Sequence, residues 1–204
     1  MEEIYSYKTI KRRSEGLYKE KGSKFIAIAY PVKSELAFKE VYTELKKEYH
    51  NARHHCFAYR INPENEEVRS NDDGEPSGTA GKPILNQLYS HELFDITVVV
   101  IRYFGGTKLG VSGLINAYKK ASIDAIKNAR ITTEHLKRYI RLDFKYPIMN
   151  DVMRVIKEEN LKIIDQNFEL DCQINLEIKK YNFDKVLNRL KKIRSVTLTT
   201  LKNS

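Results

Sequence analysis

The carboxyl-terminal third of the chain most constrains the fold, because two hydrophobic periodicities take turns along it. Apolar side chains alternate with polar ones in most of the stretches predicted to be strands, and recur at helical spacing between them. In chain order, the pattern predicts a strand at 140–146, a helix at 147–156, strands at 161–168 and 172–178, a helix at 183–193 and a strand at 196–201. This order of elements is that of the ferredoxin-like βαββαβ fold.

Residues 1–134 predict a larger domain in which helices and strands are mixed. Ser34 can cap a helix, and residues 94–104 are apolar on both faces, as in a central strand. The predicted elements are short strands at 4–8 and 15–20 that pair with each other, a strand at 25–32, a helix at 35–49, a strand at 55–61, a long polar loop at 62–82, a helix from Pro83, a strand at 94–104 and a helix at 113–129. The chain is therefore assigned to the α+β class, with domains at 1–134 and 135–204.

Composition and charge exclude several classes of protein. The 204 residues include 36 Lys and Arg against 27 Asp and Glu, a net charge of +9. Residues 135–204 alone hold 15 of these cations and nine of the acids. Such an excess favours phosphate-bearing partners such as RNA. No apolar run approaches the roughly 18 residues of a membrane helix, and no secretory signal is visible. The only cysteines, Cys56 and Cys172, suit a reducing compartment, so we expect a cytoplasmic protein without a membrane partner.

A glycine-rich segment at 102–113 joins the predicted central strand to the next helix. Its glycines permit positive φ angles and close backbone approach, and free N–H groups at the helix start attract anions. Lys108 adds a cation, but the spacing matches neither a Walker loop nor a dinucleotide-binding loop. Two interpretations stay open, an anion site and a tight turn that only permits packing. The candidate residues here are Arg102, Gly105, Gly106, Lys108, Gly110 and Gly113.

Two further segments carry chemically interesting side chains. In the polar loop, Asp72, Asp73 and Glu75 could bind a hard cation or could order the loop by accepting backbone N–H groups, and no metal is firmly assigned. On the strand that follows Arg53, alternation places His54 and Cys56 on one face and His55 on the other. Side chains two residues apart on a strand lie roughly 7 Å from each other. A Cys–His catalytic pair is therefore not expected, and we predict no catalytic residue and no cofactor.

Three blocks of this sequence resemble the Impact protein family, in its bacterial YigZ-like branch. They are residues 51–56, 71–84 and 98–113, which occur here in the family's order. The resemblance implies that the amino-terminal domain has the left-handed βαβ fold of a small-subunit ribosomal protein domain. It also implies that the carboxyl-terminal domain is ferredoxin-like, similar to the last domain of elongation factor G. The family points to a role near translation rather than to a defined reaction.

The expected function combines the residues with the resemblance. We expect a regulatory protein that binds RNA, the ribosome or a translation factor through a basic glycine-rich cleft, and we favour this interpretation over an enzyme. Two alternatives are a phosphate-handling or hydrolytic enzyme that uses the acidic loop with His54 or His55, and a protein-interaction adaptor. The sequence gives no indication of the oligomeric state. The residues expected to bind the anion are Arg53, His54, His55, Lys82, Arg102, Gly105, Gly106, Lys108, Gly110 and Gly113.

Overall fold

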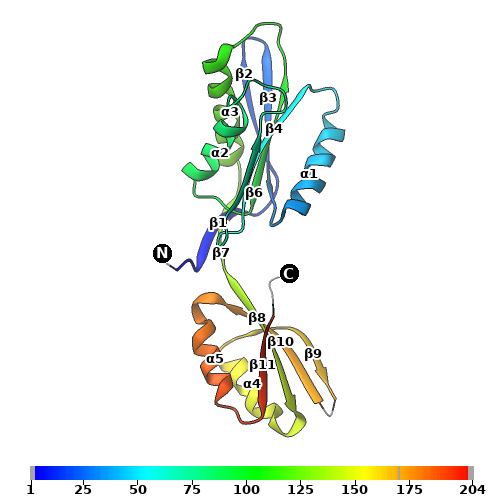
Figure 1. Ribbon diagram of the computed structural model, residues 1–204, viewed down its shortest axis with the longest axis vertical. Helices are drawn as coiled ribbons and strands as arrows, with labels where there is room; N and C mark the ends of the chain where they lie inside the picture. The colour runs from blue at the N-terminus through cyan, green and yellow to red at the C-terminus, as the bar shows by residue number, and fades with distance from the viewer. Residues whose placement is uncertain (1–2, 170, 202–204) are drawn as a thin grey trace. The chain divides into compact units, whose positions relative to one another are not determined.

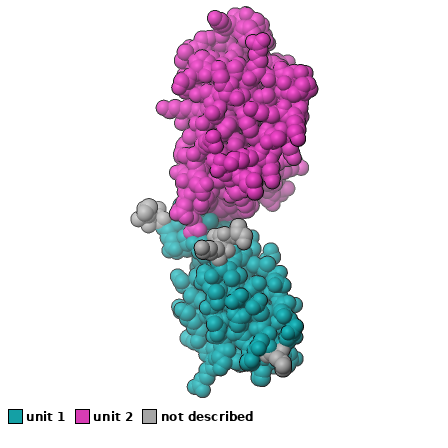
Figure 2. Space-filling model, turned by 45° about the vertical axis from the view of Figure 1, so that its right-hand side comes forward, with its two compact units in different colours: residues 1–6, 135–204 teal, residues 7–134 magenta. Residues whose placement is uncertain are grey.

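The computed structural model describes residues 3–169 and 171–201, and it consists of two compact units. Residues 7–134 form the N-terminal unit, and residues 1–6 together with 135–204 form the C-terminal unit (Figure 2). Helices and strands occur in both units, so the predicted α+β class is confirmed. We propose that these units are the two expected domains, except that residues 1–6 belong with the second one.

The C-terminal unit has the ferredoxin-like order of elements. Its strands and helices are β8 (Lys137–Lys145), α4 (Met149–Glu158), β9 (Lys162–Phe168), β10 (Asp171–Lys179), α5 (Phe183–Lys191) and β11 (Val196–Leu201), with short 3-10 turns at Tyr146–Ile148 and Lys180–Asn182. The antiparallel sheet has the order β11-β8-β10-β9. The first and third strands of the motif are therefore central, and the prediction of this fold is confirmed.

Alternation along the central strands builds the core of the C-terminal unit. Ile140 and Leu142 of β8 and Ile174 and Leu176 of β10 are fully buried. They point to the sheet face that α4 and α5 cover (Figure 1). The opposite face of the sheet consequently carries the polar members of each strand.

Glu159, at the carboxyl end of α4, fastens this helix to α5. Its carboxylate accepts hydrogen bonds from Lys185 Nζ (2.9 Å), Arg189 Nη1 (2.5 Å) and Asn182 Nδ2 (3.3 Å). These bonds, chiefly the one from Lys185 and next the one from Arg189, lower the pKa of Glu159 from its ordinary 4.5 to about 2. Glu159 therefore stays ionised in the folded protein well into the acid range.

Replacing Glu159 with glutamine is expected to remove a pH-dependent part of the stability. Because the folded pKa is the lower one, the carboxylate stabilises the fold above pH 4.5, and this contribution is lost as the pH falls from 4.5 to about 2. Urea unfolding of the wild type and of Glu159→Gln should therefore differ at neutral pH and converge across that window. Glu169→Gln, an exposed control in the same unit, should unfold like the wild type at every pH. A constant gap at every pH would contradict this assignment.

The N-terminal unit is built on a five-stranded antiparallel sheet of order β2-β3-β6-β4-β5. Its elements are β1 (Ser6–Ile10), β2 (Ser14–Glu20), β3 (Ser23–Pro31), α1 (Glu35–Glu48), β4 (His54–Ile61), β5 (Glu67–Asn71), α2 (Gly81–Ser90), β6 (Ile96–Tyr103), α3 (Gly110–Lys127) and β7 (Ile131–His135), of which β1 and β7 reach the unit boundary and form a separate two-stranded sheet. Strands β3 and β4 both run antiparallel to β6, so they are parallel to each other, and α1 connects them. The left hand of this connection stays a prediction.

The central strand β6 contributes to two cores. Val98 and Val100 pack toward α2 and α3, whereas Val99 and Ile101 pack toward α1. Figure 1 shows these helices on the two sides of the sheet. Ser34 caps α1 as predicted, since its Oγ accepts a hydrogen bond from the Ala37 N–H (3.1 Å). The sheet is thus covered by helices on both faces.

Two predictions about the strands of this unit are wrong. The early strands do not pair with each other: β1 pairs with β7, and β2 pairs with β3 across the turn Lys21–Gly22. Both turn residues have positive φ, at 46° and 77°, as the type I′ turn of a two-residue hairpin requires. The stretch at 62–82 is not wholly a loop either, because it contains the edge strand β5, whose side chains are exposed and therefore show no apolar period.

Candidate functional site

A pocket of about 470 Å³ lies at one end of the five-stranded sheet, within the N-terminal unit. It is formed where β4 begins, β6 ends and α3 begins, with the polar loop beside them. The lining residues are Arg53, His54, Glu75, Pro76, Arg102, Phe104, Lys108, Leu109, Gly110, Val111 and Leu114. The structure thus brings together the three segments that the sequence singled out.

Strand register explains why these segments meet. His54, the first residue of β4, lies opposite Arg102 near the end of β6. Alternation then places His54, Cys56 and Arg102 on the sheet face that α2 and α3 cover. His54 is held in place by its Nδ1–H, which donates to the main-chain oxygen of Asp73 (2.8 Å).

The floor of the pocket is a buried ion pair. Arg102 Nη1 donates to Glu75 Oε1 over 2.6 Å, and the two side chains are only 7% and 4% exposed. The same oxygen accepts a hydrogen bond from the Tyr118 hydroxyl (2.7 Å). Burial is the main cause that raises the pKa of Tyr118, so this hydroxyl stays a donor at physiological pH. The charge of Arg102 is therefore neutralised within the protein, and we assign Arg102 to the pocket's architecture.

Cys56 belongs to the same buried network. Its thiol lies 3.0 Å from the main-chain oxygen of Asp72 and 3.3 Å from the Tyr118 hydroxyl. Burial raises the pKa of this thiol, so it remains protonated and inert at neutral pH. The arrangement is that of a structural cysteine.

The rim of the pocket differs in character from its floor. Arg53 and Lys108 are exposed, and neither makes a hydrogen bond or an ion pair with another described residue. Phe104 is 55% exposed beside them, and Val111 is exposed as well. An apolar surface bordered by two available cations can accept a ligand that carries both a flat apolar group and negative charge.

The carboxylates of the polar loop are engaged in ordering the backbone. Asp72 accepts hydrogen bonds from the N–H groups of Gly78 (2.8 Å), Ala80 (2.9 Å) and Gly81 (2.8 Å). These bonds satisfy the start of α2, which begins at Gly81 rather than at Pro83. Asp73 Oδ2 accepts from the His55 N–H (2.7 Å). The interactions favour loop ordering over a metal site, and in the described part of the chain no cluster of three or more His, Cys, Asp or Glu suits a metal ion.

Several residues predicted to bind the anion do not line the pocket. His55 lies on the opposite face of β4, where its Nε2–H donates to the Tyr49 carbonyl (3.2 Å) and burial lowers its pKa. Lys82 is exposed on α2 and is not among the lining residues. Gly105 and Gly106 lie in the loop before α3 and Gly113 lies within α3, and none of the three lines the pocket. A side chain at Gly105 would collide with the backbone of the β2–β3 turn.

Sequence reasoning missed the residues that complete the pocket from distant parts of the chain. Tyr118 lies 43 residues from its partner Glu75, and nothing in the local pattern links them. The β2–β3 turn was also missed, although the Gly105 N–H donates to Ser23 Oγ (3.1 Å) and fixes the glycine segment there. The available signal for this turn was Gly22, which lies between the strands predicted at 15–20 and 25–32.

No helix in the described ranges is long and apolar enough to cross a membrane.

Comparison with known proteins identifies relatives over most of the chain. A family model described as the Impact N-terminal domain matches residues 21–126. IMPACT family member YvyE of Bacillus subtilis (strain 168) is 34% identical over 181 residues, which cover 88% of this chain and 83% of that protein. IMPACT family member YigZ of Escherichia coli (strain K12) is 33% identical over 154 residues, covering 73% and 74% of the two chains.

One solved structure resembles this chain along nearly its whole length. It is the crystal structure of a hypothetical protein, with a TM-score of 0.75 and 25% sequence identity. The match covers 98% of this chain and 100% of that one. The family model and the two relatives confirm the resemblance that the three sequence blocks predicted, and the solved structure shares the fold along nearly the whole chain.

Proposed function

This chain belongs to the Impact family, and we propose that it is a translation-associated regulator that binds RNA through the pocket at the end of the five-stranded sheet. Membership supports a role near translation, and the pocket supports the kind of ligand. Ribosomal RNA is the RNA that agrees both with a role near translation and with the kind of ligand that the pocket can bind. The ribosome is thus the partner that this proposal favours.

The observation that carries the proposal is the pairing of available cations with an exposed aromatic ring. Arg53 and Lys108 can each contact a phosphate, because neither side chain makes a hydrogen bond or an ion pair with another described residue. Phe104 presents an exposed ring on which an unpaired base can stack. These are the two kinds of contact by which single-stranded RNA is commonly held.

The start of α3 adds to the attraction for a phosphate. Gly110 and Val111, in its first turn, line the pocket. The side chain of its N-cap residue Leu109 makes no capping hydrogen bond with the described residues, and no acidic residue lies in this first turn. Backbone N–H groups that lack a partner at a helix start favour negative charge. This helix end therefore complements Lys108 rather than opposing it.

The alternative of a phosphate-handling enzyme receives less support. It would require Asp72, Asp73 and Glu75 to bind a divalent ion. Their oxygens instead accept the hydrogen bonds of the loop, of β4 and of Arg102. An ion would have to displace these internal partners, so we favour binding over catalysis.

The salt dependence of RNA binding provides the test. Full-length protein should bind a fluorescein-labelled single-stranded RNA more weakly as salt rises, with a log–log slope of about −0.7 per phosphate contact. Lys108→Ala should make that slope shallower by about 0.7, for RNA of any sequence. Lys82→Ala removes an equal charge outside the pocket and serves as the matched control. Fluorescence anisotropy across a salt series measures both effects.

A second variant separates stacking from charge. Phe104→Ala should weaken RNA binding by about 1–3 kcal/mol at every salt concentration and leave the slope unchanged. Co-sedimentation with ribosomes should fall for Phe104→Ala and Lys108→Ala but not for Lys82→Ala. Salt-independent binding, or equal losses for Lys82→Ala and Lys108→Ala, would refute the proposal.

A further inference from the structure

We propose that a groove between α4 and α5 of the C-terminal unit binds an acidic segment of a partner protein that carries aliphatic side chains. This surface is separate from the pocket of the N-terminal unit. The inference therefore does not rest on the proposed RNA binding, and either can fail without the other.

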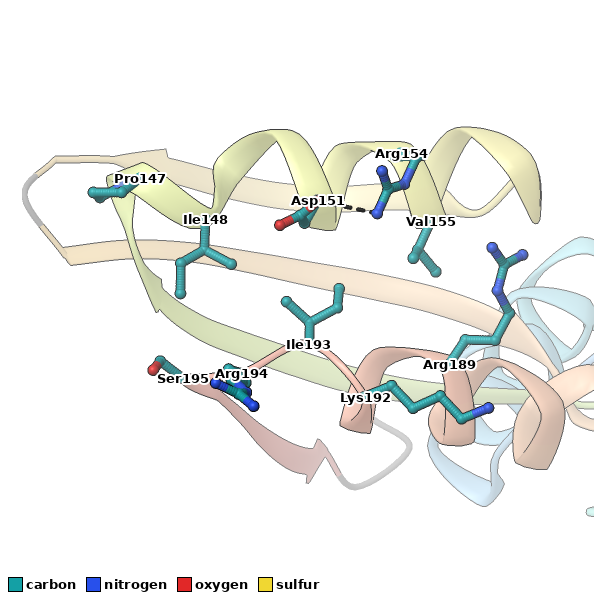
Figure 3. Close-up of a pocket in the computed structure, with 10 residues that line it drawn as sticks. All are labelled: Pro147, Ile148, Asp151, Arg154, Val155, Arg189, Lys192, Ile193, Arg194 and Ser195. Carbon is teal, nitrogen blue, oxygen red and sulfur yellow. Dashed lines mark hydrogen bonds and ion pairs between the residues drawn. The ribbon is translucent and has the colours of Figure 1, made fainter.

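An aliphatic strip forms the bottom of this groove, which has a volume of about 600 Å³. Figure 3 shows Ile148 and Val155, at the start of α4 and within it, pointing toward Ile193 on the segment that follows α5. Ile148 and Ile193 are half-buried, so part of each remains available to a ligand. An inserted leucine or isoleucine side chain would cover this apolar surface.

Cations dominate the sides of the groove. Arg154, Arg189, Lys192 and Arg194 line it against a single carboxylate, Asp151. Arg154 is paired with Asp151 over 3.0 Å, and Arg189 is paired with acids at the end of α4. Lys192 and Arg194 are exposed and contact no acid in the described part of the chain. Their two charges are left for a ligand.

The shape of the segment after α5 holds these charges at the groove. Ser195 has a positive φ of 64°, so the chain reverses sharply between α5 and β11. Lys192, Ile193 and Arg194 occupy this reversal, with the isoleucine facing inward and Lys192 and Arg194 at its sides (Figure 3). The aliphatic contact and the charges are therefore presented together on one short segment.

This chemistry favours an acidic peptide over RNA. None of the described residues that line the groove is aromatic, so they offer no ring on which a base can stack. An aliphatic strip bordered by cations is instead complementary to leucine or isoleucine anchors flanked by Asp or Glu. The occupant that fits is thus an acidic, amphipathic segment of another protein.

Binding of designed peptides to the full-length chain tests the inference. The probe is a fluorescein-labelled peptide of alternating Glu and Leu pairs. The control peptide has every Leu replaced by Ser. We expect the Leu peptide to bind and to shift the methyl signals of Ile148 and Ile193 in NMR spectra. Lys192→Glu combined with Arg194→Glu should weaken this binding by about tenfold, since two ion pairs become repulsions. The Ser peptide should also bind at least about tenfold more weakly.

A matched charge control and an RNA probe make the result decisive. Lys162→Glu combined with Lys179→Glu changes the net charge equally at strands of the same unit, outside the groove, and should bind the Leu peptide like the wild type. Equal weakening by both double variants, or no peptide binding, would overturn the inference. An oligouridylate whose affinity depends on Lys192 and Arg194, while the peptide's does not, would assign the groove to RNA and overturn it as well.

Discussion

Replacing Glu75 with alanine is expected to lower the free energy of unfolding of the N-terminal unit by about 3–5 kcal/mol. The substitution leaves the guanidinium of Arg102 buried without its counter-charge, and it also leaves the Tyr118 hydroxyl without its acceptor. A buried charge that has lost its partner is far more destabilising than the pair itself is stabilising. Native-state hydrogen exchange of the β6 amides reports the stability of this unit separately from the other.

Two further variants show whether the effect comes from the unpaired charge. Glu40→Ala removes an exposed carboxylate of α1 and should change stability by no more than about 0.5 kcal/mol. Glu75→Leu combined with Arg102→Met removes both charges and should recover much of the lost stability. If Glu75→Ala behaves like Glu40→Ala, the buried pair does not support the fold.

Replacing Gly105 with alanine is expected to destabilise the same unit by about 3 kcal/mol, at the upper end for overpacking. The added Cβ would lie 1.9 Å from the Gly22 carbonyl carbon and 2.1 Å from the Ser23 nitrogen, so one of the two backbones must move. The glycine segment would shift away from the β2–β3 turn and carry Phe104 with it. Chemical denaturation measures the loss, and amide chemical shifts of Gly22 and Ser23 should change with it.

Gly106→Ala is the matched control for this collision. A Cβ at Gly106 would meet no atom within 4 Å, but its φ of +89° is unfavourable for alanine. The expected loss is about 1 kcal/mol, from backbone conformation alone. The amides of Gly22 and Ser23 should keep their chemical shifts in this variant. Similar perturbation of that turn by both variants would contradict the packing role of Gly105.

The ferredoxin-like unit could be predicted from the sequence because most of its elements have their own hydrophobic period, β9 being the exception. The strand β8 shows this clearly, since Ile140, Leu142 and Phe144 are buried while their neighbours are not. Pairing in the N-terminal unit could not be predicted in the same way. The strand β5 is exposed at every residue and has no period, and β1 pairs with β7 from the other end of the unit. Such pairings depend on tertiary contacts that no local window contains.

The candidate site was predictable as a set of segments but not as a set of contacts. Alternation correctly separated His54 from His55. The alternation alone did not show which face of β4 would meet the glycine segment. That depends on α3 packing on one face of the sheet and α1 on the other. The partners of Arg102 and of Asp72 also depend on the tertiary fold. Arg102 was predicted to bind a phosphate but pairs with Glu75, and Asp72 was a candidate metal ligand but accepts backbone N–H groups.

The grouping of residues 3–6 with the C-terminal unit has a consequence for synthesis of the protein. The Tyr5 carbonyl accepts a hydrogen bond from the Leu136 N–H, and the Ile4 carbonyl accepts one from Lys180 Nζ, 176 positions further along. During translation residues 4 and 5 must wait for these partners until residues 136 and 180 have been made. The nascent chain can complete residues 7–134 before those contacts form.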